Sequence, residues 1–314
     1  MGGSEERHAT MTTWCAIGAI TEYRDRHAVL TLPVDLGGGV YLINLPAWAK
    51  SGAALDVLDR SKRKRVQDEC AFAFYTEYEA TASGTPDPEW EDPTPRPIQD
   101  GARERLTLAN LAVWLARPVC VPVEAVLHFD RPRDGTSIRE CSSSNGLLVH
   151  DEDRDNQLST DDLTLAKTLN EGLRGLNRDG TIWTATRLLW KALQEDMWEA
   201  RFLLNWVAME ALFGSSNPQE TTFRLSQRVA FFLASSRSEA KDIFSTAKDG
   251  YAWRSKAVHG LRLSKLSQEK SSELSHQVED LLRRTFGRVL QAPDLVTKFD
   301  SGDREQFLDE LIFS

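Results

Sequence analysis

The sequence has no long apolar run and few cysteines. No stretch approaches the roughly 20 apolar residues that a membrane-spanning helix needs, so we expect no membrane span. Its first 13 residues are polar and lack the apolar core of a signal peptide. The four cysteines are far apart, without the close spacing of zinc or redox motifs, and we interpret them as reduced thiols. These absences predict a cytoplasmic protein.

Clusters of metal-binding residues are also missing from the sequence. The six histidines are scattered, and none stands at a ligand spacing from acids or cysteines. We therefore expect neither a metal ion nor a cofactor. The chain also lacks an internal repeat at the period of a solenoid.

Positive charge is scarce overall but unevenly distributed. The net charge of −9 by itself argues against a nucleic-acid partner. Residues 221–290, however, hold 13 Lys and Arg against 7 Asp and Glu, a local balance of +6. Such a region can contact phosphates. The alternative is an uneven surface charge without a function.

The first half of the chain mixes strand and helix signals. Four β-rich runs predict strands at residues 28–33, 40–44, 121–129 and 146–150. A loose apolar spacing predicts a helix over residues 51–82, with one face formed by Leu55, Leu58, Val66, Cys70 and Phe74. Five prolines between residues 84 and 97 predict a long loop. A second apolar helix follows and ends at Pro118. We expect a mixed α/β domain over residues 1–155.

The second half is predicted to be almost wholly helical. Ser159 offers a hydroxyl cap, and Asp161 and Asp162 place acids in the first turn of a helix. The periodicity predicts helices near residues 160–176, 181–194, 196–214, 220–235, 238–258, 266–291 and 303–311. The fold class is therefore expected to be α+β, with an all-α domain over residues 156–314.

The third of these predicted helices is apolar on nearly all sides, which is typical of a central core helix. We expect its Trp206 and Met209 to be largely buried. Glu210 interrupts the apolar surface, and a buried carboxylate needs a partner or stays protonated. Arg224 and Arg228 lie one turn apart on the next predicted helix. We expect a structural contact between Glu210 and one of these arginines; a catalytic role for Glu210 is the alternative.

Three segments of the second half carry a recognisable pattern at residues 206–214, 224–233 and 251–260. In this order and spacing they resemble the ApeA-like branch of the HEPN (higher eukaryotes and prokaryotes nucleotide-binding) superfamily. The resemblance covers roughly residues 160–290. It implies a compact helical bundle that often pairs two-fold. Many relatives are metal-independent endoribonucleases of prokaryotic anti-phage defence or toxin systems, so RNA is the implied substrate.

Relatives of this kind use an arginine and a histidine that are separated by four to six residues. Arg254 and His259 match this pattern with four residues between them, and the resemblance implies that they are the catalytic pair. Nearby residues are expected to support the site or to bind RNA: Tyr251, Ser255, Lys256 and Arg262.

The chemistry of these residue types suits RNA cleavage without a metal. Such cleavage uses the 2′-hydroxyl as an internal nucleophile, and it needs proton transfer at two oxygens and charge stabilisation on the phosphorane. Histidine titrates near neutral pH and suits the proton transfer. Arginine is permanently charged and forked, so it suits the phosphate.

The spacing of Arg254 and His259 raises a geometric question. Five residues rotate about 500° along a helix, which leaves the two side chains about 140° apart. Gly260 suggests that the helix ends at His259, and a helix end could bring the groups together. A two-fold-related subunit could do the same, because a symmetric interface duplicates each residue. We therefore expect a homodimer with its axis near this segment.

A second interpretation of the motif stays open. His259 could be a helix C-terminal histidine favoured by the macrodipole, and Arg254 an ordinary ion-pairing arginine. The domain would then be a non-catalytic HEPN module that binds a nucleotide or a protein partner. Toxins controlled by a partner nucleotidyltransferase often carry a tyrosine where this chain has Leu261, which puts that control in doubt. An inhibitor or trigger acting through the N-terminal domain is a further expected partner.

Overall fold

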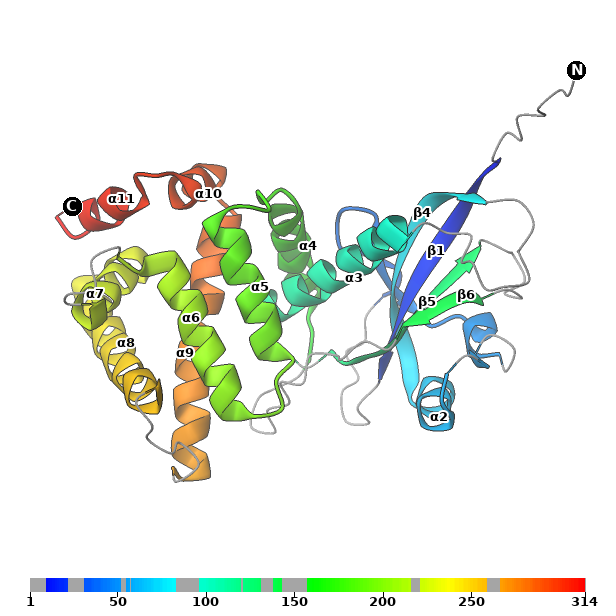
Figure 1. The fold of residues 1–314 in the computed structure, drawn as a ribbon, viewed down its shortest axis with the longest axis horizontal. Helices are drawn as coiled ribbons and strands as arrows, with labels where there is room; N and C mark the ends of the chain where they lie inside the picture. Colours follow the sequence, from blue (N-terminus) through cyan, green and yellow to red (C-terminus); the bar gives the residue numbers. More distant parts are fainter. Residues whose placement is uncertain are drawn as a thin grey trace, which may run out of the picture. The chain divides into compact units, whose positions relative to one another are not determined.

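The structure is a computed structural model of the chain. It describes residues 10–21, 31–51, 55–56, 58–82, 96–119, 121–130, 138–142, 157–215, 221–258 and 266–313. The chain divides into two compact units, residues 1–170 and 171–314 (Figure 1). The division falls inside helix α4 (Thr160–Arg174), whereas the predicted boundary at residue 155 lies before this helix.

A single antiparallel sheet forms the centre of the first unit. Its six described strands have the order β2-β3-β4-β1-β5-β6. Their bounds are β1 (Thr10–Thr21), β2 (Val34–Asp35), β3 (Val40–Asn44), β4 (Cys70–Ala82), β5 (Val123–Asp130) and β6 (Ile138–Ser142). Strands β3 and β5 confirm two predicted strands. Residues 31–33 of another predicted strand are not β, and residues 28–30 and 146–150 lie outside the described part.

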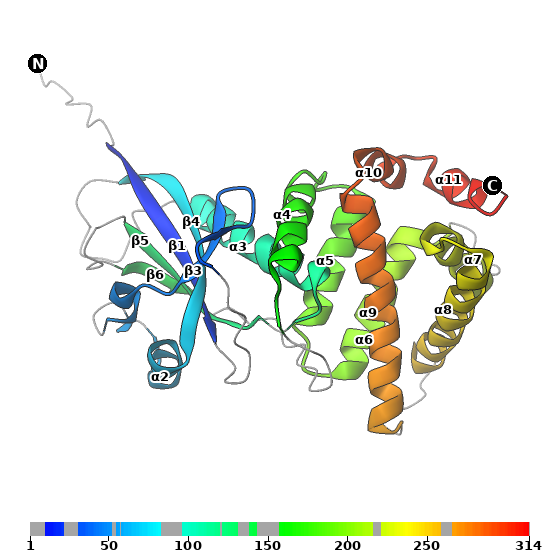
Figure 2. The same ribbon diagram turned by 180° about the vertical axis from the view of Figure 1, so that it is seen from behind.

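Helices cover both faces of this sheet (Figures 1 and 2). Alternate residues of a strand point to opposite faces, and the central strand β1 is apolar on both. Gly18 faces α3 (Arg96–Ala116), because a Cβ built on it would lie 3.6 Å from Leu106 Cδ1. On the opposite face a buried cluster joins the sheet to α2 (Arg60–Asp68) and the short helix η1 (Ala47–Lys50). Its members include Cys15, Ile17, Ala19, Ala49, Leu58 and Val66.

The long helix predicted over residues 51–82 is wrong. Only Arg60–Asp68 of this segment is described as a regular α-helix, and residues 70–82 form strand β4. Four of the five apolar residues behind the prediction do share one buried cluster: Leu55, Leu58, Val66 and Cys70. Phe74 instead lies against Gly18 on the other face of the sheet. Shared burial was mistaken for a single helical face because segments of different kinds contribute to one core.

The cysteines of the first unit that the structure describes are buried. Cys15 and Cys70 are free thiols. Burial, the largest cause, raises the pKa of the Cys70 thiol to about 11. Thiolates are the reactive form of cysteine, so this side chain is chemically inert near neutral pH. Cys120 lies outside the described residues, and the side chain of Cys141 is not described.

The described residues of the second unit form helices joined by short connections (Figure 2). Its helices after α4 are α5 (Thr181–Leu193), α6 (Trp198–Phe213), α7 (Thr221–Leu233), α8 (Arg237–Val258), α9 (Gln268–Leu290), α10 (Pro293–Asp300) and α11 (Arg304–Glu310). All predicted helices are confirmed, and α10 is an addition. The predicted cap of α4 is confirmed as well, because the Asp162 amide donates to Ser159 Oγ at 3.1 Å.

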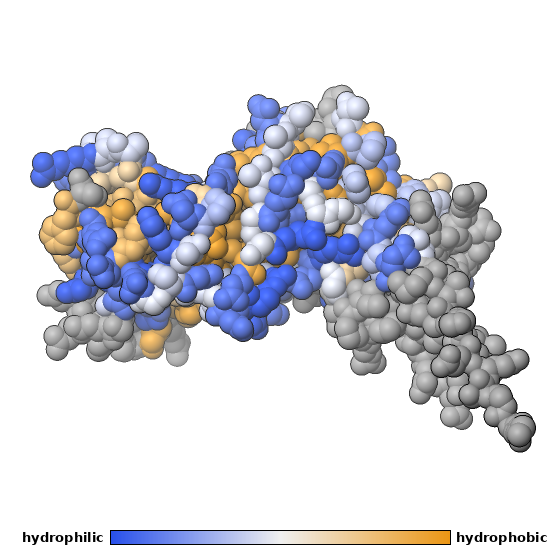
Figure 3. Space-filling model, turned by 90° about the horizontal axis from the view of Figure 1, so that it is seen from above, coloured by the Kyte–Doolittle hydropathy of each residue, from blue (hydrophilic) through white to orange (hydrophobic). Residues whose placement is uncertain are grey.

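Helix α6 lies at the centre of the second unit, where it packs against α5, α7, α8 and α9. Trp206 is 1% exposed and Met209 is fully buried, which confirms the prediction of a core helix. The molecular surface is more mixed in polarity than this buried core. In the view from above, hydrophilic and hydrophobic residues are interspersed (Figure 3). Among the described residues, no helix has the combination of length and hydropathy that crossing a membrane requires.

Candidate functional site

Helices α6 and α8 approach closely at Gly250. A Cβ atom built on this residue would lie only 2.6 Å from Trp206 Cζ2. The glycine thus leaves room for the indole of Trp206, which in turn packs edge-on against the ring of Tyr251, with 5.5 Å between the ring centroids. The last turns of α8 therefore pack against α6 at the position of Trp206.

Glu210 of α6 is the centre of a polar cluster on this seam. The hydroxyl of Tyr251 donates to Glu210 Oε1 at 2.5 Å. The guanidinium of Arg254 donates from Nη2 to Glu210 Oε2 at 2.8 Å. The side chains of Arg254 and Glu210 are 22% and 23% exposed, so the ion pair is partly shielded from water but reachable from it.

The prediction that Glu210 contacts an arginine of the next helix therefore names the wrong arginine. Glu210 does bind an arginine, but that arginine is Arg254 of α8 rather than Arg224 or Arg228 of α7. The reason is packing: α8 runs alongside α6 and brings Tyr251 and Arg254, which are three residues apart on one face, to the carboxylate. The two arginines of α7 contact other acids.

The electrostatics of the cluster favour a neutral tyrosine. Burial, followed by the hydrogen bond to Glu210, raises the pKa of Tyr251 to about 12. The tyrosine hydroxyl therefore stays protonated and acts as a donor across the physiological range. Arg254 Nε and Trp206 Nε1 are buried without a hydrogen-bond partner among the described residues. A ligand can therefore reach Arg254 only through the part of its guanidinium that stays exposed, and a charge-assisted contact to an anion suits that part.

The remaining residues of the predicted site lie on the same end of α8 or beyond it. Ser255 is half-buried, and Lys256 is exposed with its Nζ 4.5 Å from the ring centre of Trp253. Both His259 and Arg262 lie outside the described residues, as does Leu261. The described structure thus brings Tyr251, Arg254 and Glu210 together, and the pairing of Arg254 with His259 stays a prediction.

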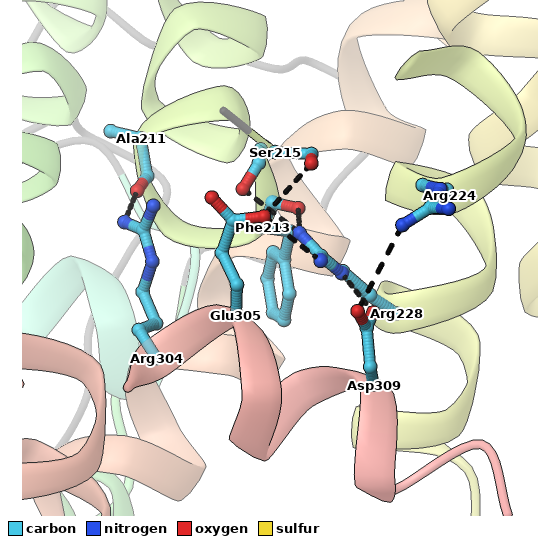
Figure 4. A network of polar contacts seen from close by, with 9 residues as sticks. Ala211, Phe213, Ser215, Arg224, Arg228, Arg304, Glu305 and Asp309 are labelled. Carbon is cyan, nitrogen blue, oxygen red and sulfur yellow. Dashed lines mark hydrogen bonds and ion pairs between the residues drawn. The ribbon is translucent and has the colours of Figure 1, made fainter. Parts of the chain in front are cut away.

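A second polar cluster surrounds Arg228 of α7, whose side chain is fully buried (Figure 4). Its Nε donates to Asp309 Oδ1 at 2.8 Å, and its Nη2 lies 3.3 Å from Glu305 Oε2. Its Nη1 donates to the carbonyl oxygens of Phe213 and Gly214 at 3.2 and 3.0 Å. One guanidinium therefore caps the C-terminal end of α6 and fastens α11 to it.

Neighbouring residues extend this second cluster. Arg304 donates from Nη1 to the carbonyl of Ala211, and Ser215 donates to Glu305 Oε2 at 2.8 Å. Arg224 is more peripheral, with Nη1 3.9 Å from Asp309 Oδ2. Sequence reasoning missed the acids of α11. Their spacing of four residues, which puts both on one helix face, was the available signal.

Neither cluster resembles a metal centre. Among the residues that the structure describes, no group of three or more His, Cys, Asp or Glu side chains is placed to hold a metal ion. Both clusters instead pair arginines with carboxylates. Such pairs can hold helices together or bind a charged ligand.

Comparison with known proteins places the chain in no family. No protein-family model, no curated protein and no solved structure matches it. The likeness to HEPN domains therefore depends on the three sequence segments alone.

The close approach at Gly250 gives a first prediction. Gly250→Ala is expected to destabilise the protein by about 1–3 kcal/mol, because the added methyl group forces the buried indole of Trp206 to move. Gly287→Ala in α9 is the matched control, since a methyl group at that position would enter open space. It should stabilise by up to about 1 kcal/mol through helix propensity. Thermal melts of both variants measure this, and equal shifts of the same sign would contradict the prediction.

Proposed function

We propose that the second unit is a HEPN-type endoribonuclease domain that cleaves RNA without a metal ion. In this proposal Arg254 and His259 act on the scissile phosphate, and the protein serves prokaryotic anti-phage or toxin-like defence. An inhibitor or trigger acts through the first unit. The fold supports the coarse part of the proposal, because a helical unit follows a unit of mixed helices and strands along the chain.

One observation carries the proposal: Arg254 presents an oriented, partly exposed guanidinium near the end of α8, five residues before His259. An arginine on a freely solvated helix face has many conformations and is poorly suited to catalysis. Here Glu210 and Tyr251 hold the side chain from the protein side. Lys256 adds a further positive charge on the same turn.

The proposed reaction is an internal transfer of the phosphodiester. The 2′-oxygen attacks phosphorus as a base removes its proton, and the P–O5′ bond breaks as an acid protonates the leaving oxygen. The products are a 2′,3′-cyclic phosphate and a 5′-hydroxyl end. His259 suits the proton transfers, and Arg254 suits the negative charge that builds up on the phosphorane oxygens.

Incubation of the purified protein with total RNA tests the proposal directly. Cleavage is expected to continue unchanged in EDTA and to leave 5′-hydroxyl ends, which a polynucleotide kinase labels without prior dephosphorylation. Intact RNA, or cleavage that EDTA abolishes, would contradict the metal-independent mechanism.

A non-catalytic HEPN module is the second candidate function. The ion pair between Arg254 and Glu210 favours it, because an arginine with a carboxylate partner can be purely structural. On this alternative neither the wild type nor any variant cleaves RNA, and Arg254→Ala changes only ligand affinity or folding. A nucleotide or a protein partner would then occupy the exposed side of Arg254.

The spacing of Arg254 and His259 supports a further prediction about assembly. We expect a homodimer whose two-fold axis passes near the end of α8, so that the two subunits combine their arginines and histidines. Val258, an apolar residue within the motif that is 55% exposed, fits a contact surface better than a solvated one. Light scattering at micromolar concentration tests this, and a strict monomer in both free and RNA-bound protein would contradict it.

A further inference from the structure

The seam between α6 and α8 contains a chain of contacts that leads from a buried aromatic pair to a partly exposed cation. Trp206 packs on the ring of Tyr251, whose hydroxyl binds Glu210, whose other oxygen binds Arg254. We propose that Glu210 and Tyr251 are positioning residues, which hold the Arg254 guanidinium in the orientation in which it binds an RNA phosphate. This inference rests on the proposed function and assigns the roles of two further residues in it.

Tyr251 can act on RNA only indirectly, through Glu210 and Arg254. The residue is 6% exposed and its hydroxyl is hydrogen-bonded to Glu210, which leaves little access for a phosphate or a base. Among the described residues, the hydroxyl has a single acceptor in Glu210 Oε1, at the short distance of 2.5 Å. Of the two roles expected from the sequence, support of the site or contact with RNA, these observations favour support.

Glu210 holds one edge of the guanidinium and leaves another available. Oε2 binds Nη2, and Nε faces the protein interior, where it is buried. Arg254 keeps part of its side chain exposed, so the ligand must approach from the side away from Glu210. The two carboxylate oxygens are therefore divided, one toward Tyr251 and one toward Arg254, and loss of either contact lets the carboxylate rotate.

The ring of Tyr251 contributes a second restraint on the arginine. The Arg254 Cζ atom lies 5.4 Å from the ring centre, within the range of a cation–π contact. Tyr251→Phe keeps this ring and its packing on Trp206 but removes the hydroxyl. The substitution thus isolates the contribution of the hydrogen bond to Glu210.

Kinetics of the full-length protein test the positioning role. Tyr251→Phe and Glu210→Gln are each expected to lower kcat about 10- to 100-fold, as small misplacements of a catalytic group do, with KM changed less than threefold. Glu210→Gln should retain more activity than Glu210→Ala, because the amide oxygen can still accept one hydrogen bond. Tyr75→Phe is the matched control: it removes a tyrosine–glutamate hydrogen bond of the same 2.5 Å length in the first unit, and should leave kcat unchanged.

An NMR measurement without RNA separates this inference from the proposed function. The Arg254 Nε–H should exchange with water slowly in the wild type and in Tyr75→Phe, and at least tenfold faster in Tyr251→Phe and Glu210→Ala. This result supports the positioning role even if the protein cleaves no RNA. Absence of cleavage would end only the proposed function. Unchanged exchange in both site variants overturns the inference. A higher kcat in Glu210→Gln also overturns it, because Glu210 would then inhibit Arg254.

Discussion

His259→Ala is expected to abolish RNA cleavage while leaving the thermal melt nearly unchanged. Positioned acid–base groups supply about 100- to 10,000-fold in rate. A histidine near a helix end contributes at most about 1–2 kcal/mol of stability through the macrodipole. Cleavage assays and melts of the same preparations measure both effects. His276→Ala in α9 is the control, since it removes a histidine outside the motif and should cleave at the wild-type rate.

Arginine variants extend this prediction to the second member of the pair. Arg254→Ala should lose most activity, because phosphate binding and charge stabilisation disappear together. Arg254→Lys should rescue only part, since an ammonium keeps the charge but lacks the fork. Equal cleavage by the wild type and His259→Ala would end the catalytic assignment and point to a contaminating nuclease.

Arg228→Ala is expected to produce the largest loss of stability. Its guanidinium is fully buried and binds two carboxylates and two carbonyl oxygens at once. Its loss leaves the Phe213 and Gly214 carbonyl oxygens without this donor and a cavity in place of the side chain, at a cost of about 3–5 kcal/mol in total. For a unit of this size, the melting temperature should fall by about 10 °C or more.

Two variants sharpen the test of this buried contact. Arg228→Lys should recover only part of the loss, because one ammonium cannot bind Asp309, Glu305 and the carbonyls together. Arg224→Ala, which removes a neighbouring arginine that is 41% exposed, should cost less than about 1 kcal/mol. If Arg228→Ala melts like Arg224→Ala, the contact does not fasten α11.

The helices of the second unit could be predicted because each buries one face or, in α6, nearly every face. Residues of the first unit were harder to interpret. Strand β1 was missed because both of its faces are buried, so that the alternation of polar and apolar residues that usually indicates a strand is absent. Helix α10 was missed although Pro293 stands in its first turn, where proline is favoured.

The candidate site was predicted in part. Sequence patterns indicated that Glu210 needs a cation and that Arg254 matters, but not that the two residues meet. Periodicity along one helix shows which residues share a face, and it does not show which other helix that face touches. Arg224 and Arg228 were nearer in sequence, whereas α8 is nearer in space at the position of Glu210.

The contact of Arg228 with α11 limits the order in which the sequence can change. Glu305 and Asp309 are 32% and 38% exposed, so water can solvate either acid after the arginine is lost. Arg228 is fully buried, so losing both acids first would leave its charge buried without a carboxylate partner. A tolerated mutational route must therefore replace at most one acid before the arginine becomes apolar. Related sequences that keep Arg228 should then keep at least one of the two acids, Glu305 or Asp309. Sequences that keep Arg228 but have lost both acids should be absent.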